Sequence, residues 1–198
     1  NEQGNRARKL FAAVVLAAVF GFFWYKSDQE QRAWQDKFDT AMKLPNGEFE
    51  AALRQIMQDC PLEDTLEQTA FELGEARDKG AVSVLTKALD KGGVIAQESA
   101  LALAKIGGTE AKAAADKIFT HMNSSEELMK VKFAWALVAL GDERGFEVLL
   151  EGINRQLVSP KTLPEYDEEL VAQMATTDKL IQLADASDPM LKMYAAME

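Results

Sequence analysis

The chain has 198 residues, of which 47% are hydrophobic and 27% are charged, so it is long enough for one globular domain and too apolar for a disordered chain. Its formal net charge of −10 is unevenly spread, because residues 1–26 carry +3 and the remaining residues carry −13. A domain this acidic repels phosphate backbones, so nucleic acid is excluded as an expected partner.

Residues 1–9 form a basic flank, and residues 10–26 are predicted to form a transmembrane helix. The sixteen residues 10–25 lack charged side chains, and as a helix they span about 24 Å of a hydrocarbon core of roughly 30 Å. Trp24 and Tyr25 stand where an interfacial aromatic belt is expected. A cleaved signal peptide is an alternative, but the bulky residues that end the run suit a signal peptidase badly. A buried helix of a soluble core is another, but it would show polar positions on one side.

The basic residues around this segment predict its orientation. Arg6, Arg8 and Lys9 precede it closely, whereas Lys26 alone follows it immediately. Because positive residues are retained on the cytoplasmic side, we expect a cytoplasmic N-terminus and a large domain across the membrane. In a two-membraned bacterium this is a single-pass inner-membrane protein with a periplasmic domain, held in the lipid bilayer through residues 10–26.

Residues 27–47 are predicted to form an amphipathic stalk and a turn. Trp34, Phe38 and Met42 recur at four-residue spacing and therefore share one face of a helix. We expect this face to pack on the domain that follows, rather than to bind a cofactor. Pro45 and the adjacent Asn-Gly pair are typical of a helix end and a turn.

The sequence pattern of residues 48–153 predicts a series of helices separated by short breaks. Apolar residues recur at helical spacing, no stretch alternates convincingly with period two, and alanine and leucine outnumber valine and isoleucine. The predicted helices cover 48–58, 62–75, 80–90, 94–106, 110–121, 126–140 and 143–153. The predicted fold class is all-α.

This region contains an internal repeat. Residues 100–107 (ALALAKIG) align with residues 134–141 (AWALVALG), and a weaker copy ends at Gly74. The final glycines of the three copies lie 33 and 34 residues apart. Alanines let paired helices approach closely, the larger aliphatic residues fill the space between layers, and each glycine is expected to end its helix. Units of this kind cannot bury their apolar faces alone, so they must stack.

The segments 73–85, 97–107 and 140–145 resemble the HEAT-repeat family, particularly the short bacterial type that also occurs in bilin lyases. The similarity covers roughly residues 62–153. It implies an α-solenoid of helical hairpins whose extended concave surface binds a partner protein. The link to bilin lyases also implies an alternative, a lyase- or chaperone-like protein acting on a bound protein or cofactor.

Residues 154–198 interrupt the repeat. A loop with two prolines is expected over 154–164, followed by a helix that begins at Glu165 and a final pair over 178–186 and 189–197. We interpret these helices as a cap on the stack.

The residue types that carry chemistry are sparse. Cys60 is the only cysteine and His121 the only histidine, which excludes an internal disulfide and a histidine-based metal cluster. Two acidic clusters, at Glu63, Asp64 and Glu67 and at 167–169, stand where carboxylates favour a helix N-terminus. We therefore predict no catalytic, cofactor-binding or metal-binding residue, and no enzyme activity.

Four aromatic residues are candidates for contact with a partner. Phe133 and Trp135 are left over when the inner face of their helix is assigned, so they either pack on the adjacent repeat or stand exposed as anchors. Trp34 and Phe38 of the stalk are the other two. The expected function is that of a scaffold or accessory subunit that binds other protein subunits of a membrane complex.

Overall fold

The computed structural model of the chain describes residue 22, residues 25–155 and residue 157. Most of the predicted membrane-spanning segment 10–26 lies outside the described residues, and so do the C-terminal helices predicted from residue 165 onward. Within the described residues, no helix combines the length and the apolar character needed to cross a membrane.

Every regular element in the described part of the chain is helical, which confirms the all-α class there. A first helix covers residues 25–41. The elements after it are α2 (Glu48–Asp59), α3 (Glu63–Glu75), η1 (Lys79–Ala81), α4 (Val82–Ala88), η2 (Leu89–Lys91), α5 (Gly93–Ile106), α6 (Gly108–Lys112), α7 (Ala115–Ser124), α8 (Glu127–Ala139), η3 (Glu143–Gly145) and α9 (Phe146–Asn154), where η marks a 3-10 helix. These bounds lie within three residues of the predicted ranges. The range 110–121 is divided into α6 and α7, whereas 80–90 and 143–153 each combine an α-helix with adjoining 3-10 turns.

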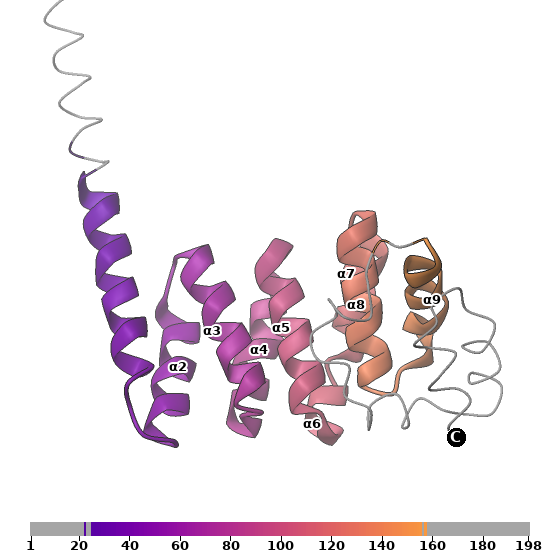
Figure 1. The fold of residues 1–198 in the computed structure, drawn as a ribbon, viewed down its shortest axis with the longest axis horizontal. Helices are drawn as coiled ribbons and strands as arrows, with labels where there is room; N and C mark the ends of the chain where they lie inside the picture. The colour runs from indigo at the N-terminus through magenta and orange to yellow at the C-terminus, as the bar shows by residue number, and fades with distance from the viewer. Residues whose placement is uncertain (1–21, 23–24, 156, 158–198) are drawn as a thin grey trace, which may run out of the picture.

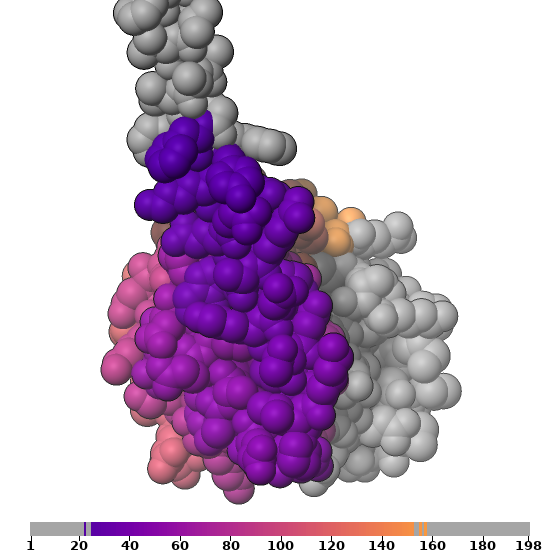
Figure 2. Space-filling view, turned by 90° about the vertical axis from the view of Figure 1, so that its left-hand side faces the viewer, coloured from indigo at the N-terminus to yellow at the C-terminus, as the bar shows by residue number. Residues whose placement is uncertain are grey.

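The helices stack in chain order along one row (Figure 1). Helices α3, α5 and α8 stand side by side in one layer, while α2, α4 and α7 each pack against the helix that follows them in this layer. The first helix stands at the N-terminal end of the row, and Figure 2 looks onto this end. Each helix pair therefore contacts mainly the pair before it and the pair after it.

A repeated pair of buried residues holds the layers together. The pair consists of an alanine and, three positions later, a leucine, each with 0% exposure in α3, α5 and α8. The members are Ala70 and Leu73, Ala100 and Leu103, and Ala134 and Leu137. The small alanine lets neighbouring helices approach, and the leucine fills the space that remains.

The ends of these three helices define the register of the repeat. The residue in the left-handed conformation after each helix is Arg77 (φ 48°), Gly107 (φ 64°) or Gly141 (φ 75°). After α3 and α8 the next backbone N–H donates back over five residues, from Asp78 to the Leu73 oxygen (3.1 Å) and from Asp142 to the Leu137 oxygen (2.9 Å). The units are therefore spaced by 30 and then 34 residues.

Gly74 does not end its helix, so the predicted role of this glycine is wrong. It lies inside α3, is buried, and a Cβ placed on it would be 2.8 Å from the Cα of Ala102 in α5. The physical reason for a glycine here is the close approach of two helices, not a left-handed turn. The aligned spacing of 33 residues for the first copy was wrong for the same reason.

The first helix packs on the row through part of its predicted stripe. Phe38 and Ala41 are buried and Trp34 is half-buried, whereas Met42 is 39% exposed because the helix ends at residue 41. The predicted turn is confirmed: Gly47 adopts φ 93°, and its backbone N–H donates to the Glu50 carboxylate.

Candidate partner-binding groove

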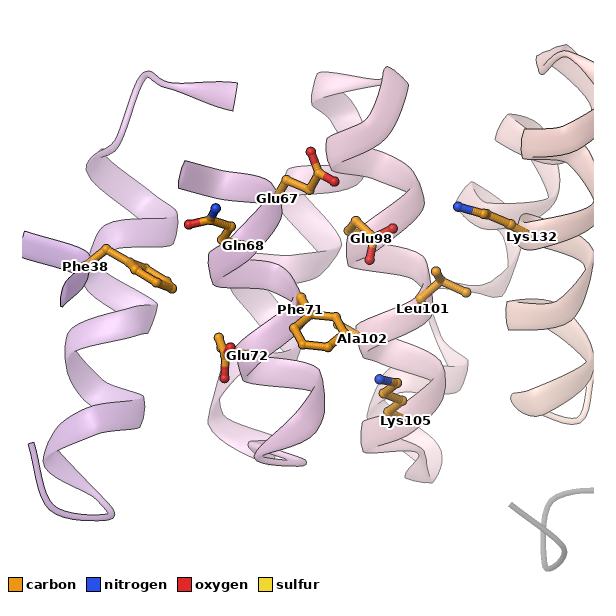
Figure 3. Close-up of a pocket in the computed structure, with 10 residues that line it drawn as sticks. All are labelled: Phe38, Glu67, Gln68, Phe71, Glu72, Glu98, Leu101, Ala102, Lys105 and Lys132. Carbon is orange, nitrogen blue, oxygen red and sulfur yellow. The ribbon is translucent and has the colours of Figure 1, made fainter. Parts of the chain in front are cut away.

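A groove of about 580 Å³ crosses the surface of α3 and α5, and Figure 3 shows its ten lining residues. The first helix contributes Phe38 at one end, and α8 contributes Lys132 at the other. The groove therefore spans successive helical units of the row.

The floor of the groove is apolar, and it follows from the repeat register. Phe71 in α3 and Leu101 in α5 each stand one residue after the buried alanine of their unit. Phe71 is 45% exposed, which is unusual for a phenylalanine in a domain with a well-packed core. Ala102, which also lines the groove, has a small side chain that fills little of its volume. An apolar side chain of a partner would find contact area here.

Charged side chains border this floor. Glu67, Glu72 and Glu98 contribute carboxylates. The ammonium group of Lys105 lies 4.8 Å from the centroid of the Phe71 ring and forms an ion pair with Glu75, so it links α5 to α3. Lys132 reaches into the groove from α8, and its ammonium group points toward Glu98 of α5 (Figure 3).

On the opposite layer, too, ion pairs connect neighbouring elements. Lys117 in α7 pairs with Asp90 in η2 at 2.9 Å. Arg144 bridges Asp116 of α7 (2.8 Å) and Asp142 (2.6 Å). The hydrogen bond from the Arg144 side chain lowers the pKa of Asp142, and the same contacts raise the pKa of Arg144. These pairs join one helical unit to the next.

A second hollow, of about 460 Å³, lies between the first helix and α2. Trp34 lines it together with aliphatic residues that include Leu44 and Ile56. The Lys37 ammonium group stands 3.8 Å from the centroid of the Trp34 ring and covers one of its faces. The stalk candidates are thus separated, because Trp34 faces this hollow and Phe38 faces the groove on α3 and α5.

The other two aromatic candidates are packed. Phe133 is 1% exposed and stacks on the His121 ring with 5.6 Å between ring centroids. Trp135 occupies the same repeat position as Phe71 and Leu101, yet it is only 5% exposed. Of the two arrangements considered for this pair, the structure shows the packed one, and neither side chain forms an exposed anchor.

The remaining candidates have local structural roles. Cys60 is buried, and its sulfur accepts the Leu62 N–H at 3.4 Å. Glu63 and Asp64 stand in the first turn of α3, whereas Glu67 lines the groove. The described residues contain no group of three or more His, Cys, Asp or Glu side chains placed to hold a metal. The acidic cluster at 167–169 lies outside the described residues.

Comparison of the chain with models of protein families and with curated protein sequences gave no match. The HEAT resemblance therefore stays a prediction.

The groove is not evident when the repeat copies are aligned on their glycines, because this alignment gives the wrong register for the first unit. Aligned on glycines, Phe71 matches Ala104. Aligned on the alanine–leucine pair, Phe71 matches Leu101 and Trp135, which gives a row of large apolar residues on one face of the layer. The signal for that row was present in the sequence. Phe71, Leu101 and Trp135 each directly follow an alanine and stand two residues before a leucine.

Proposed function

We propose that this chain is a membrane-anchored scaffold or accessory subunit, whose helical row is an α-solenoid of HEAT-like hairpins that binds another protein beside the membrane. The observation that carries this proposal is the groove on α3 and α5, built from equivalent positions of successive units and floored by the half-exposed Phe71. Surfaces of stacked helical units are extended, so they suit protein segments better than compact small molecules.

The apolar run at residues 10–25 supports the anchor. An anchor confines the groove to the membrane surface, which raises its effective concentration toward partners held in the same membrane. The basic flank supports a cytoplasmic N-terminus and a domain on the far side of the bacterial inner membrane.

Native purification tests the binding function. The full chain, tagged at its C-terminus and extracted in mild detergent, is expected to co-purify with at least one other protein at fixed stoichiometry. A chain that migrates alone under these conditions would contradict the proposal.

Membrane extraction tests the anchor separately. The full chain is expected to stay in the membrane pellet after carbonate treatment, whereas a chain without residues 1–26 is expected in the supernatant. Equal release of both forms would rule out the anchor and leave the groove unaffected.

A further inference from the structure

The charges of the groove are ordered along its helices. Glu67 on α3 and Glu98 on α5 both lie above the apolar floor formed by Phe71 and Leu101, and Lys132 of α8 lies near the level of Glu98 (Figure 3). Within the described residues, neither carboxylate forms an ion pair; Glu98 accepts only a hydrogen bond from the Gln97 amide, at 2.8 Å. The lining holds three carboxylates, Glu67, Glu72 and Glu98, against Lys132 and against Lys105, which pairs with Glu75, so the groove keeps a net negative charge.

Some carboxylates elsewhere in the row have a cationic partner: Asp78, Asp90 and Asp116 each face a basic side chain from another element. Carboxylates that form no ion pair within the chain can accept one from outside, and a basic side chain of a partner would supply it. The groove thus combines an apolar contact surface with a charge that a partner can complement.

The possible occupants differ in charge. Residues 158–198 carry three lysines against eight acidic residues, and residues 27–198 as a whole carry −13, so charge disfavours both the C-terminal segment and a second copy of this domain. Nucleic acid is also negatively charged, so charge disfavours it as well. A protein segment with basic side chains is the occupant that complements this end of the groove.

Building on the proposed scaffold function, we infer that the groove binds a partner-protein segment in which a lysine or arginine lies close to an aliphatic side chain. The basic group contacts Glu67 and Glu98, and the aliphatic group rests on Phe71 and Leu101. Glu67 and Phe71 are four residues apart on α3, which is about 6 Å along the helix axis. Residues one helical turn apart, or two apart in an extended segment, match this distance.

Photo-crosslinking in the native membrane identifies the occupant. The full chain carrying Phe71→benzoylphenylalanine is irradiated, and the crosslinked peptide is sequenced by mass spectrometry. A chain carrying Val94→benzoylphenylalanine serves as the control, because Val94 is similarly exposed (43%) and does not line the groove. We expect a crosslink at position 71 to a segment of another protein that contains lysine or arginine within four residues of the attachment point.

A crosslink from position 71 to residues 158–198, to a second copy, or to a segment without a basic residue would overturn the inference. So would equal crosslinking from positions 71 and 94 to the same segment.

A charge-removal pair tests the role of the carboxylates. E67Q/E98Q is expected to lower the crosslinking yield at position 71 at least fivefold, whereas E110Q/E147Q, which removes two exposed carboxylates outside the groove, is expected to leave the yield unchanged. Thermal melts of both variants check that the fold is retained. If the partner co-purifies equally with the full chain and with E67Q/E98Q, the groove inference is wrong and the scaffold function stands. If nothing co-purifies with the unaltered chain, the scaffold function itself is wrong.

Discussion

At the scale of single residues, two kinds of glycine position serve this fold in different ways. Gly107 and Gly141 supply the left-handed conformation at a helix end, a role that Arg77 fills in the first unit. Gly74 supplies space, because it faces Ala102 where α3 and α5 are closest. The same residue type therefore marks a turn in one unit and a helix contact in another.

The substitution Gly74→Ala tests the second role. Alanine favours helix by about 1 kcal/mol over glycine in an exposed position, but here its methyl group would overlap Ala102 and push α3 from α5. We expect a net destabilisation of about 1–3 kcal/mol in urea unfolding. The exposed substitution Ser83→Ala on α4 is the control and should change stability by less than about 0.5 kcal/mol. A Gly74→Ala chain more stable than the parent would contradict the close approach.

Asp142 gives a pH-dependent prediction. Its hydrogen bond from the Arg144 side chain lowers its pKa in the folded chain below the ordinary value of 3.8. The ionised carboxylate therefore stabilises the fold above that pH, and its contribution is lost as the pH falls through the folded-state pKa.

We expect Asp142→Asn to be less stable than the parent at pH 6, by about 1 kcal/mol or less because the pair is near the surface. This difference in the free energy of unfolding, measured by urea unfolding, should disappear as the pH is lowered from 4 to 2. Glu147→Gln removes an exposed carboxylate and provides the control. A gap that stays constant with pH would show that Asp142 acts without its charge.

At the scale of elements, the first helix is attached to the row by few side chains. Phe38 and Ala41 are buried and Trp34 is half-buried, while most of its other described residues are exposed. Elements with few buried contacts open at lower free energy than the core. The first helix can therefore be loosened without unfolding α3 and α5.

The substitution Phe38→Ala should distinguish loosening of the first helix from unfolding of the whole row. We expect amide hydrogens of residues 25–41 to exchange at least tenfold faster than in the parent, while those of α5 keep their protection. Met42→Ala, from the same predicted stripe but 39% exposed, should leave both rates nearly unchanged. Faster exchange in α5 as well would mean that the first helix and the row unfold together.

At the scale of the whole molecule, stability is shared between neighbouring units, since each helix pair contacts mainly the pairs beside it. Helix α5 occupies the middle, in contact with α3, α4 and α8. Its Leu103 is fully buried. A cavity at this point removes contacts on both sides of the row.

Leu103→Ala is therefore expected to lower the free energy of unfolding by about 2–5 kcal/mol, with one cooperative transition at a lower urea concentration. Leu128→Ala, at a position 54% exposed on α8, is the matched control and should shift the transition little. Similar midpoints for the two variants would contradict the central position of α5 in the core.

The sequence by itself determined the helical class of the described residues and the bounds of their helices. Helical spacing of apolar residues and the Pro45 and Asn-Gly break act locally, so no knowledge of distant contacts was needed. Packing decided the rest. Gly74 lies inside α3 because the distance between α3 and α5 leaves no room for a side chain there, and Arg77 adopts the left-handed conformation that was expected at Gly74. Phe71 is half-exposed and Trp135 buried at equivalent positions because burial depends on what the neighbouring segments cover. The groove depends on both, so only the tertiary structure decided where this chain offers a surface to a partner.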